Sequence, residues 1–306
     1  MIAAHNEGDN LWRTVQSTIA STAGIEYDIL VADDASTDSS VAELLKRCPD
    51  VTVVSHETRR GVSTTKDMGG RTARGEVLVF LDAHCKPQNG AIAHLVSRVR
   101  ELECKSIVVP AVPALNCDTW ENNMGQVGNG YICGLVDFEC RWINCQEMRR
   151  CGLLYESPAL MGCCVAVGRQ LYEELWGFDT GMREWGQEDL DFGLKAWLTG
   201  HHIYHDPRAV IGHRFQRAFT RFTVTSESVL ANQLRMARKN FTDNVWLDWM
   251  KRCRERQSTD VWDRAWAVFE QGRESLENER DHLFALRVRD EFMFAIQFGL
   301  AWPVNA

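Results

Sequence analysis

The sequence has no run of about 20 uncharged apolar residues, the length that a membrane-spanning helix needs. Its first seven residues lack the basic start and the long apolar region of a secretory signal peptide. Internal repeats, heptads and low-complexity linkers are also missing. We therefore expect a soluble, cytoplasmic protein without a membrane partner, in which the 45% of hydrophobic residues can form a large core.

Positive charge is scarce, since 34 Lys and Arg residues stand against 42 Asp and Glu residues and give a formal net charge of -8. A surface that neutralises many phosphates needs the opposite balance, so nucleic acid is a minor hypothesis. A group of basic residues near the predicted C-terminal helices nevertheless keeps DNA open as a partner. These residues are Arg214, Arg217, Arg221, Arg235, Arg238 and Lys239.

The eleven cysteines include no tight C-x-x-C pair. The run Cys133, Cys140, Cys145 and Cys151 therefore lacks the spacing that is typical of a structural zinc site. Because the sequence shows no secretion signal, we expect the cysteines to be free thiols.

Strand-like and helix-like segments alternate along the first hundred residues. Short β-branched or aliphatic runs predict strands, and apolar residues at three- and four-residue steps predict helices. The predicted strands cover residues 27–32, 51–55 and 76–81, and the predicted helices cover residues 10–21 and 39–47. This alternation is typical of an α/β fold with a mostly parallel central sheet flanked by helices, in which ligands bind at the carboxyl ends of strands.

The pattern changes twice farther along the chain. After residue 105, short strands and loops are predicted, and a helix follows over residues 188–198. Beyond Thr220, apolar and aromatic residues recur at helical steps, which predicts a C-terminal helical extension. We interpret the tryptophans of this extension as core rather than as a substrate platform: Trp246, Trp262 and Trp266.

Three polar clusters follow predicted strands, at residues 5–7, 33–36 and 82–84. The last of them, Asp82-Ala83-His84, closes the apolar run VLVFL. In a strand, residues one and three point to the same side, so Asp82 and His84 offer two ligands to one divalent ion. The same two residues also fit a solvated strand end or a helix cap, and the pair alone does not separate these interpretations.

Longer motifs occur in order along the chain: AAHNE, VADDASTD, FLDAHC, GFDTGMREWGQEDLDFGLKAWLTG at residues 177–200, VIGHRF at residues 210–215 and NQLRMARKNFTDNVWLDW. Through these motifs the chain resembles family 2 glycosyltransferases of the Rossmann-like GT-A fold. It resembles most closely the catalytic domain of the polypeptide N-acetylgalactosaminyltransferases. The resemblance extends from residue 3 to about residue 250.

The resemblance implies a metal-dependent glycosyltransferase that moves a hexose or an N-acetylhexosamine from a UDP-sugar to a hydroxyl group of a peptide Ser or Thr or of a saccharide. It also implies Asp82, His84 and His213 as metal ligands. Mn²⁺ is the expected ion and Mg²⁺ the alternative, because Mg²⁺ favours all-oxygen ligands. The implied donor-binding residues are His5, Glu7, Asp33, Asp34, Arg59, Lys66, Asp82 and Ala83.

On the acceptor side, the resemblance implies that Trp185 lines the sugar pocket and that Glu188 and Asp189 act on the acceptor. The close relatives have Asn where this chain has Asp189. A carboxylate there suits a general base for inversion, whereas Glu188 suits a positioning role in retention, so both outcomes stay open. Structural interpretations are also open: a core tryptophan, two acids in a first helical turn, and for His213 a buried, hydrogen-bonded histidine.

The resemblance divides the chain into a nucleotide-binding half at residues 1–104, an acceptor-binding half at residues 105–220 and the helical extension at residues 221–306. We expect neither the membrane anchor nor the β-trefoil that the secreted relatives carry. One alternative acceptor is a hydroxymethylated base of DNA. A nucleotidyltransferase is disfavoured because no glycine-rich loop follows Ala4. An alternative of another class is a non-catalytic module that binds a nucleotide or a glycan.

Overall fold

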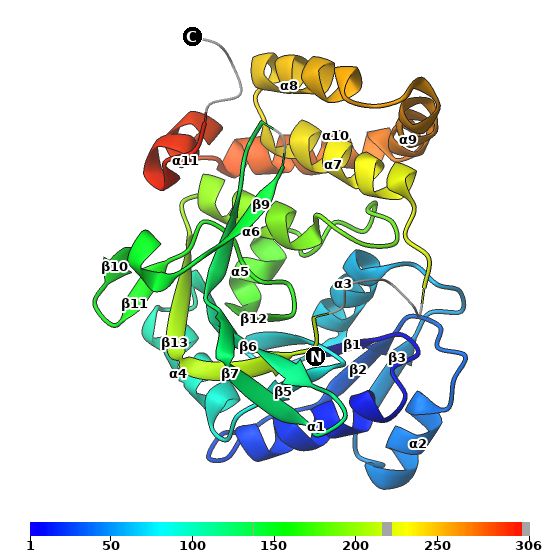
Figure 1. The fold of residues 1–306 in the computed structure, drawn as a ribbon, viewed down its shortest axis with the longest axis vertical. Helices are drawn as coiled ribbons and strands as arrows, with labels where there is room; N and C mark the ends of the chain where they lie inside the picture. Colours follow the sequence, from blue (N-terminus) through cyan, green and yellow to red (C-terminus); the bar gives the residue numbers. More distant parts are fainter. Residues whose placement is uncertain (137, 216–221, 302–306) are drawn as a thin grey trace.

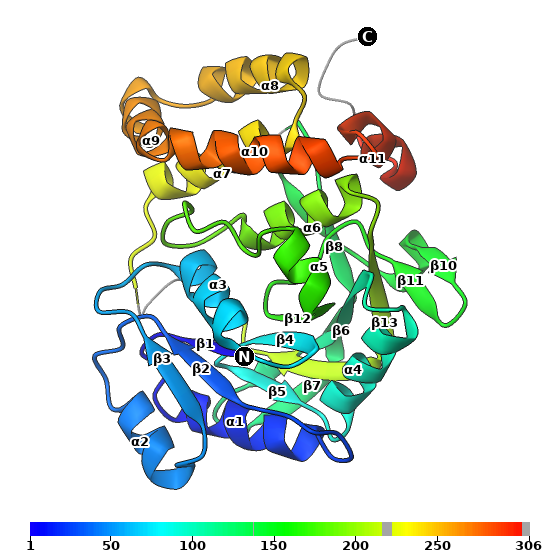
Figure 2. The same ribbon diagram turned by 180° about the vertical axis from the view of Figure 1, so that it is seen from behind.

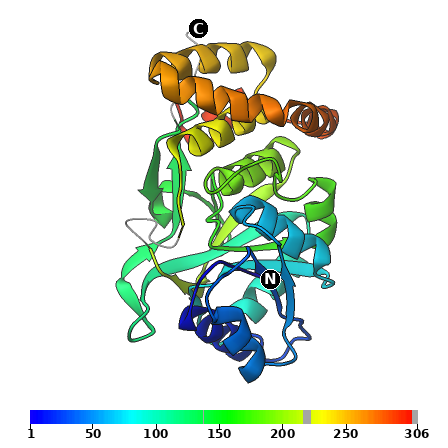
Figure 3. The same ribbon diagram turned by 90° about the vertical axis from the view of Figure 1, so that its right-hand side faces the viewer.

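The fold is built on one mixed β-sheet. The computed structural model describes residues 1–136, 138–215 and 222–301, and within them eleven strands join in that sheet (Figure 1). The strand order is β10-β11-β13-β6-β12-β4-β1-β2-β3, with β5 beside β13 and β7 beside β6. Seen from the side, the C-terminal helices form the layer farthest from the sheet (Figure 3). The predicted α/β class with a helical extension is therefore confirmed.

The N-terminal half is a parallel four-stranded unit with its connecting helices. Its strands are β1 (Ile2–Ala4), β2 (Leu30–Asp33), β3 (Thr52–Ser55) and β4 (Val77–Asp82). Its helices are α1 (Asp9–Ser21), α2 (Ser40–Arg47), α3 (Val62–Thr72) and α4 (Ala91–Glu101). Ala4 pairs with Asp33 and Ala3 pairs with Asp82, so the polar residues that follow β1, β2 and β4 meet at one edge of the sheet.

Alternation along the strands sends neighbouring side chains into two separate cores. Leu81 packs in one core with Leu11 of α1 and Leu95 of α4. Phe80, its neighbour on β4, belongs to the core on the other face, together with Phe192. Both faces of the sheet are thereby buried, which explains the nearly continuous apolar runs of these strands.

The second half completes the sheet. Its central strands are β6 (Ser106–Asn116), β12 (Cys164–Gly168) and β13 (His202–His213). Its shorter strands are β5 (Cys85–Pro87), β7 (Glu121–Gly128), β10 (Arg149–Cys151) and β11 (Leu154–Glu156), and its helices are η1 (Cys145–Glu147), α5 (Arg169–Glu174) and α6 (Glu188–Leu198). The antiparallel pairing of β5 with β13 sets His213 opposite Cys85, directly beside the position of His84.

A separate two-stranded sheet consists of β8 (Gly130–Cys133) and β9 (Cys140–Ile143). Cys133 and Cys140 face each other in its ladder and form a disulfide. The prediction of free thiols is therefore wrong for these two cysteines, whereas the other nine are thiols. Sequence spacing did not show this pair because the hairpin register alone brings the two side chains together.

Five helices occupy the described part of the C-terminal extension: α7 (Ser226–Asn240), α8 (Asp243–Glu255), α9 (Thr259–Gln271), α10 (Arg273–Leu286) and α11 (Glu291–Phe298) (Figure 2). Trp246 and Trp262 are buried in the core of this region and Trp266 packs against it, which confirms their interpretation as core. The domain boundary predicted at residue 220 lies outside the described residues. Among the helices that the structure describes, none combines the length and the apolar character of a membrane span.

A buried ion network ties α7 to the rest of the protein. Nζ of Lys239 lies 2.6 Å from Asp179, 2.9 Å from Asp191 and 2.9 Å from Glu279, and Arg235 donates to Asp179 at 2.8 Å. Burial opposes the charge of Asp179, but Lys239 and Arg235 outweigh it and hold the pKa of this carboxyl well below its usual value. The network thereby joins α7 and α10 of the extension to α6.

This network also changes the interpretation of the basic residues that kept DNA open as a partner. Arg235 and Lys239 are buried and paired with acids, so they do not form part of a DNA-binding surface. Arg238 pairs with an acid of α10. Arg217 and Arg221 lie outside the described residues.

We expect Lys239→Met to lower the free energy of unfolding by about 3 to 5 kcal/mol, because Asp179 and Asp191 then stay buried with too little positive charge nearby. The control is Arg252→Met, which breaks the half-exposed pair with Asp248 and should cost less than about 1 kcal/mol. Urea denaturation followed by circular dichroism measures both values. Equal losses in the two variants would contradict a structural role for the network.

Candidate active site

A cavity of about 610 Å³ lies where the carboxyl ends of β1, β2 and β4 approach the N-terminus of α6. Its lining includes every residue predicted for donor, metal or acceptor except Asp33 and Ala83. Asp33 instead accepts the backbone N–H of Ser36, and Ala83 is buried in the core below. The predicted residues in the lining are His5, Glu7, Asp34, Arg59, Lys66, Asp82, His84, Trp185, Glu188, Asp189 and His213.

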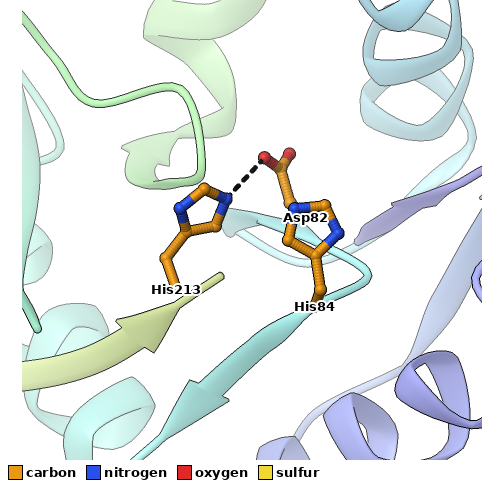
Figure 4. A group of neighbouring side chains, drawn as sticks. All are labelled: Asp82, His84 and His213. Carbon is orange, nitrogen blue, oxygen red and sulfur yellow. Dashed lines mark ion pairs between the residues drawn. The ribbon is translucent and has the colours of Figure 1, made fainter. Parts of the chain in front are cut away.

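Asp82, His84 and His213 converge in this cavity (Figure 4). Asp82 ends β4, His84 lies in the turn to β5, and His213 ends β13. Nε2 of His213 is 3.5 Å from Oδ2 of Asp82, and one ligand atom from each of the three residues lies within 4.8 Å of the others. Such a cluster can hold one divalent ion and leave coordination positions for a ligand in the cavity.

The surroundings of the two histidines fit a metal ion. Both ring nitrogens of His213 are buried, and neither has a hydrogen-bond partner among the described residues. Because buried polar atoms seldom lack partners, this arrangement indicates a ligand that the polypeptide does not supply. Nδ1 of His84 contacts Glu7, which leaves Nε2 for the metal. Two imidazoles and one carboxylate suit a transition-metal ion better than Mg²⁺.

Glu7 orients the ring of His84, a contact that the sequence did not predict. Its Oε1 lies 3.0 Å from Nδ1 of His84, and its Oε2 accepts an N–H of Asn10 at 3.3 Å. Burial opposes the charged form of His84, but the Glu7 carboxylate outweighs burial and the pKa of His84 is raised. A carboxylate behind a ligating histidine holds the ring in place and makes it a better ligand.

Lys66 is buried, with 1% of its side chain exposed, between two groups of acids. Its Nζ donates to the carbonyl of Gly162 at 2.9 Å and to Glu188 at 3.2 Å, and it lies 3.6 Å from Asp82. Burial alone would raise the pKa of Asp82, but Lys66 and His213 outweigh it and lower that pKa. Burial also raises the pKa of Glu188, against the effect of Lys66. Lys66 thus stabilises two carboxylates of the site, whereas the sequence predicted a contact with donor phosphates.

Asp34 holds the loop that follows β3. Its carboxylate accepts the backbone N–H groups of Arg60 at 2.6 Å and of Gly61 at 2.9 Å. Gly61 has a φ of 93°, and an added Cβ would collide with the facing backbone at 2.6 Å, so glycine is required there. The backbone carbonyl of Asp34 contacts Nδ1 of His5 at 2.6 Å. Asp34 thus contacts both His5, which follows β1, and the loop after β3 that carries Arg59, and both of these residues line the cavity.

The first turn of α6 carries Glu188 and Asp189, the two acids predicted for the acceptor side. Glu188 is buried against Lys66. Oδ2 of Asp189 accepts the hydroxyl hydrogen of Tyr131 at 2.6 Å. Trp185, just before the helix, lines the cavity and is 43% exposed, so it is not a core tryptophan. The two carboxylates and the metal cluster therefore share one cavity.

Several residues of the lining were not predicted: Tyr131, Trp142, Met161, Cys163 and Phe222. Tyr131 and Trp142 lie opposite each other on the hairpin of β8 and β9. The sequence around them shows no alternation or turn motif that marks a site, and single aromatic residues are frequent in loops. Only the packing of the hairpin beside α6 brings these side chains to the cavity.

Two family descriptions match the chain. Residues 1–176 match Glycosyl transferase family 2, and residues 145–217 match the N-terminal domain of galactosyltransferase. Polypeptide N-acetylgalactosaminyltransferase 12 of Mus musculus is 30% identical over 266 residues, which cover 82% of this chain and 44% of that protein. Polypeptide N-acetylgalactosaminyltransferase 6 of Homo sapiens is 31% identical over 268 residues, covering 82% and 42%. The chain thus spans less than half the length of these relatives.

Solved structures share the fold. The crystal structure of GalNAc-T7 with UDP, GalNAc and Mn²⁺ matches with a TM-score of 0.74 at 22% identity, covering 97% of this chain and 55% of that one. The structure of S. aureus TarS 1–349 in complex with UDP-GlcNAc matches with a TM-score of 0.55 at 14% identity, covering 93% and 78%. These likenesses confirm the expected GT-A fold.

We expect Glu7→Gln to weaken Mn²⁺ binding about 10- to 100-fold, because the ring of His84 loses the carboxylate that orients it. Glu43→Gln on α2, outside the cavity, is the control and should leave the affinity unchanged. The electron paramagnetic resonance signal of free Mn²⁺ measures binding. An unchanged affinity in Glu7→Gln would contradict the orienting role, and a wild-type protein that binds no Mn²⁺ would contradict the metal site itself.

Proposed function

The chain belongs to glycosyl transferase family 2, and from this premise we propose that it transfers a hexose or an N-acetylhexosamine from a UDP-sugar to a hydroxyl acceptor with the help of Mn²⁺. The observation that carries the proposal is that one cavity is lined both by the cluster of Asp82, His84 and His213 and by the carboxylates of Glu188 and Asp189. Sugar transfer from a nucleotide needs a cation for the leaving diphosphate and a group that orients or deprotonates the acceptor. The cavity offers both.

On the donor side, Asp82, His84 and His213 would hold the ion, which stabilises negative charge on the leaving diphosphate when it is bound. His5, Asp34 and its loop lie where β1 and β2 end, the place at which an α/β sheet binds nucleotides. The GalNAc-T7 structure with UDP, GalNAc and Mn²⁺ supports this choice of donor and metal. Mg²⁺ is the second choice because the cluster has two imidazoles.

On the acceptor side, Glu188 and Asp189 would receive the hydroxyl group, and Trp185 would pack its apolar face against a sugar ring. The similar curated proteins are named polypeptide N-acetylgalactosaminyltransferases, which supports a Ser or Thr side chain of a peptide as the acceptor. A saccharide hydroxyl is the alternative acceptor, since the same groups would orient it.

The acceptor proton has two routes. In inversion, Asp189 takes the proton while the acceptor oxygen bonds to the anomeric carbon and the bond to the diphosphate breaks. In retention, Glu188 positions the acceptor and the departing diphosphate takes the proton. Glu188 is buried and paired with the cation of Lys66. Asp189 is partly exposed and, within the described residues, accepts hydrogen bonds from neutral donors only, and this favours Asp189 as the base.

The alternatives have less support. Arg235 and Lys239, which kept a DNA acceptor open, are buried in the ion network of α7. A non-catalytic nucleotide-binding module gives no reason for the buried ring nitrogens of His213 to lack a hydrogen-bond partner among the described residues. Both alternatives predict the absence of sugar transfer to peptide or saccharide acceptors.

Location and domain limits stay predictions. A cytoplasmic protein without a membrane partner was expected, but the Cys133–Cys140 disulfide is more typical of an oxidising compartment. We propose the division at residues 1–104, 105–220 and 221–306, although the core of the extension also includes Trp197 of α6. Cell fractionation with alkylation of free thiols would test the compartment.

A screen of UDP-sugars for UDP release tests the function. We expect the protein to consume at least one donor with Mn²⁺ and to stop when EDTA removes the metal. His213→Ala should abolish this release with an unchanged circular dichroism spectrum, whereas His201→Ala, outside the cavity, should retain it. Equal UDP binding with and without Mn²⁺, together with no turnover of any donor, would contradict the enzyme and support a binding module.

If Asp189 is the general base, we expect Asp189→Asn to lower kcat by at least about 100-fold. Proton NMR of the glycosidic linkage should then show inversion. The control is Asp248→Asn on α8, which should leave kcat unchanged. A near wild-type rate for Asp189→Asn with a retained linkage would assign the acceptor role to Glu188 instead.

A further inference from the structure

We propose that Tyr131 is a positioning residue of the acceptor site, whose hydroxyl holds the carboxylate of Asp189, and that the hairpin of β8 and β9 couples this contact to the C-terminal helices. This inference rests on the proposed function and assigns a task within it to a residue that the sequence did not single out. It also gives the helical extension a task in the reaction.

The carboxylate of Asp189 is held from three directions. Oδ2 accepts the hydroxyl hydrogen of Tyr131 at 2.6 Å and lies 3.3 Å from the backbone N of Gly162. Oδ1 accepts the backbone N–H of Leu190 at 2.9 Å. The contact with Tyr131 is the shortest of the three and joins a neutral donor to a carboxylate, a pairing that is stronger than a hydrogen bond between neutral groups. It is also the only one of these three contacts that comes from another side chain.

Tyr131 is suited to donate this bond. Burial first, and then the neighbouring charge of Asp189, raises the pKa of the Tyr131 phenol well above its usual value. The hydroxyl therefore keeps its proton at neutral pH. The side chain lines the same cavity as the metal cluster, so the bond lies at the place where an acceptor would enter.

The hairpin that carries Tyr131 is anchored in the C-terminal helices. A two-stranded hairpin alone is marginally stable, so it needs support from outside. Leu135 and Phe138, in the loop between the two strands, are buried in the core that the extension forms. The ring of Phe138 lies 5.0 Å from that of Trp249 on α8 and 6.2 Å from that of Phe241.

The disulfide closes the same hairpin. Cys133 and Cys140 form the pair nearest the loop, and Tyr131 lies two positions from Cys133, opposite Trp142. The loop therefore packs against the helices at one end, and the base of the hairpin presents Tyr131 to Asp189 at the other. Through this unit, the packing of α8 sets the position of a carboxylate on α6.

The test is Tyr131→Phe, which removes one oxygen and keeps the ring. We expect kcat for transfer to the acceptor to fall about 10- to 100-fold, because a misplaced catalytic group costs rate without changing donor affinity. KM for the UDP-sugar, Mn²⁺-dependent UDP affinity and donor hydrolysis without acceptor should stay at wild-type values. Tyr155→Phe on β11, outside the cavity lining, is the matched control and should behave as wild type.

A double-mutant cycle shows whether Tyr131 acts through Asp189. Single-turnover transfer rates are measured for Tyr131→Phe, Asp189→Ala and the double variant. The tyrosine substitution should lose its effect, to within about twofold, once the carboxylate is gone, because coupled residues are not additive. A full additional loss in the double variant would overturn the proposed coupling.

Failure of the inference differs from failure of the proposed function. If the wild-type protein transfers the sugar and Tyr131→Phe does so with the same kcat, the positioning role alone is overturned. A loss of UDP affinity and of donor hydrolysis equal to the loss of transfer would show a general structural effect and also overturn it. A wild-type protein that turns over no UDP-sugar would refute the proposed function itself.

Discussion

The buried ammonium group of Lys66 lies between the carboxylates of Asp82 and Glu188 and allows both to line one cavity. Asp82 belongs to the strand that ends at the metal cluster, and Glu188 belongs to the helix of the acceptor side. Without a cation between them, the buried Glu188 and the partly buried Asp82 would be costly as two negative charges, because desolvation disfavours each carboxylate and they repel each other. Lys66 on α3 removes this conflict and stabilises the approach of α6 to the carboxyl end of β4.

Other polar side chains of the cavity are likewise held by a partner from a different element. Glu7 holds the ring of His84, and Tyr131 holds the carboxylate of Asp189. The exception is His213, whose ring nitrogens have no hydrogen-bond partner within the described residues. A carboxylate behind one histidine, and a second histidine whose buried ring nitrogens lack hydrogen-bond partners among the described residues, suit a site that binds a metal ion.

The C-terminal helices help to position residues of the cavity, although none of Asp82, His84 and His213 belongs to them. Lys239 and Arg235 of α7 pair with Asp179, which lies in the segment leading to α6. The core of the extension holds the loop of the β8–β9 hairpin, whose base reaches the cavity. The extension is therefore part of the framework that surrounds α6, and its core also includes Leu194, Trp197 and Leu198 of α6.

Much of the fold could be predicted from the sequence because it depends on neighbours within one strand or one helical turn. The helix at residues 188–198 follows from hydrophobic periodicity and is observed with these bounds. The strands predicted at residues 27–32 and 76–81 are observed as Leu30–Asp33 and Val77–Asp82, so the first of them begins three residues later than predicted. The motif around Asp82 and His84 likewise places two ligands on one side of the chain. The resemblance to a known family extended this set to His213, more than a hundred residues away.

Contacts between distant segments were decided only by the tertiary structure. Lys66 was expected at donor phosphates and Glu7 along a nucleotide, and these roles stay predictions. The structure adds a contact that was not predicted for either residue, from Lys66 to Glu188 and from Glu7 to His84. Cys133 and Cys140 pair, and Lys239 is buried, because of register and packing that no local pattern encodes. The sequence by itself determined which polar residues follow the strands and open the helix at Glu188. The tertiary structure decided which charge faces which, because the energy of a buried polar group depends on the partner that folding brings to it.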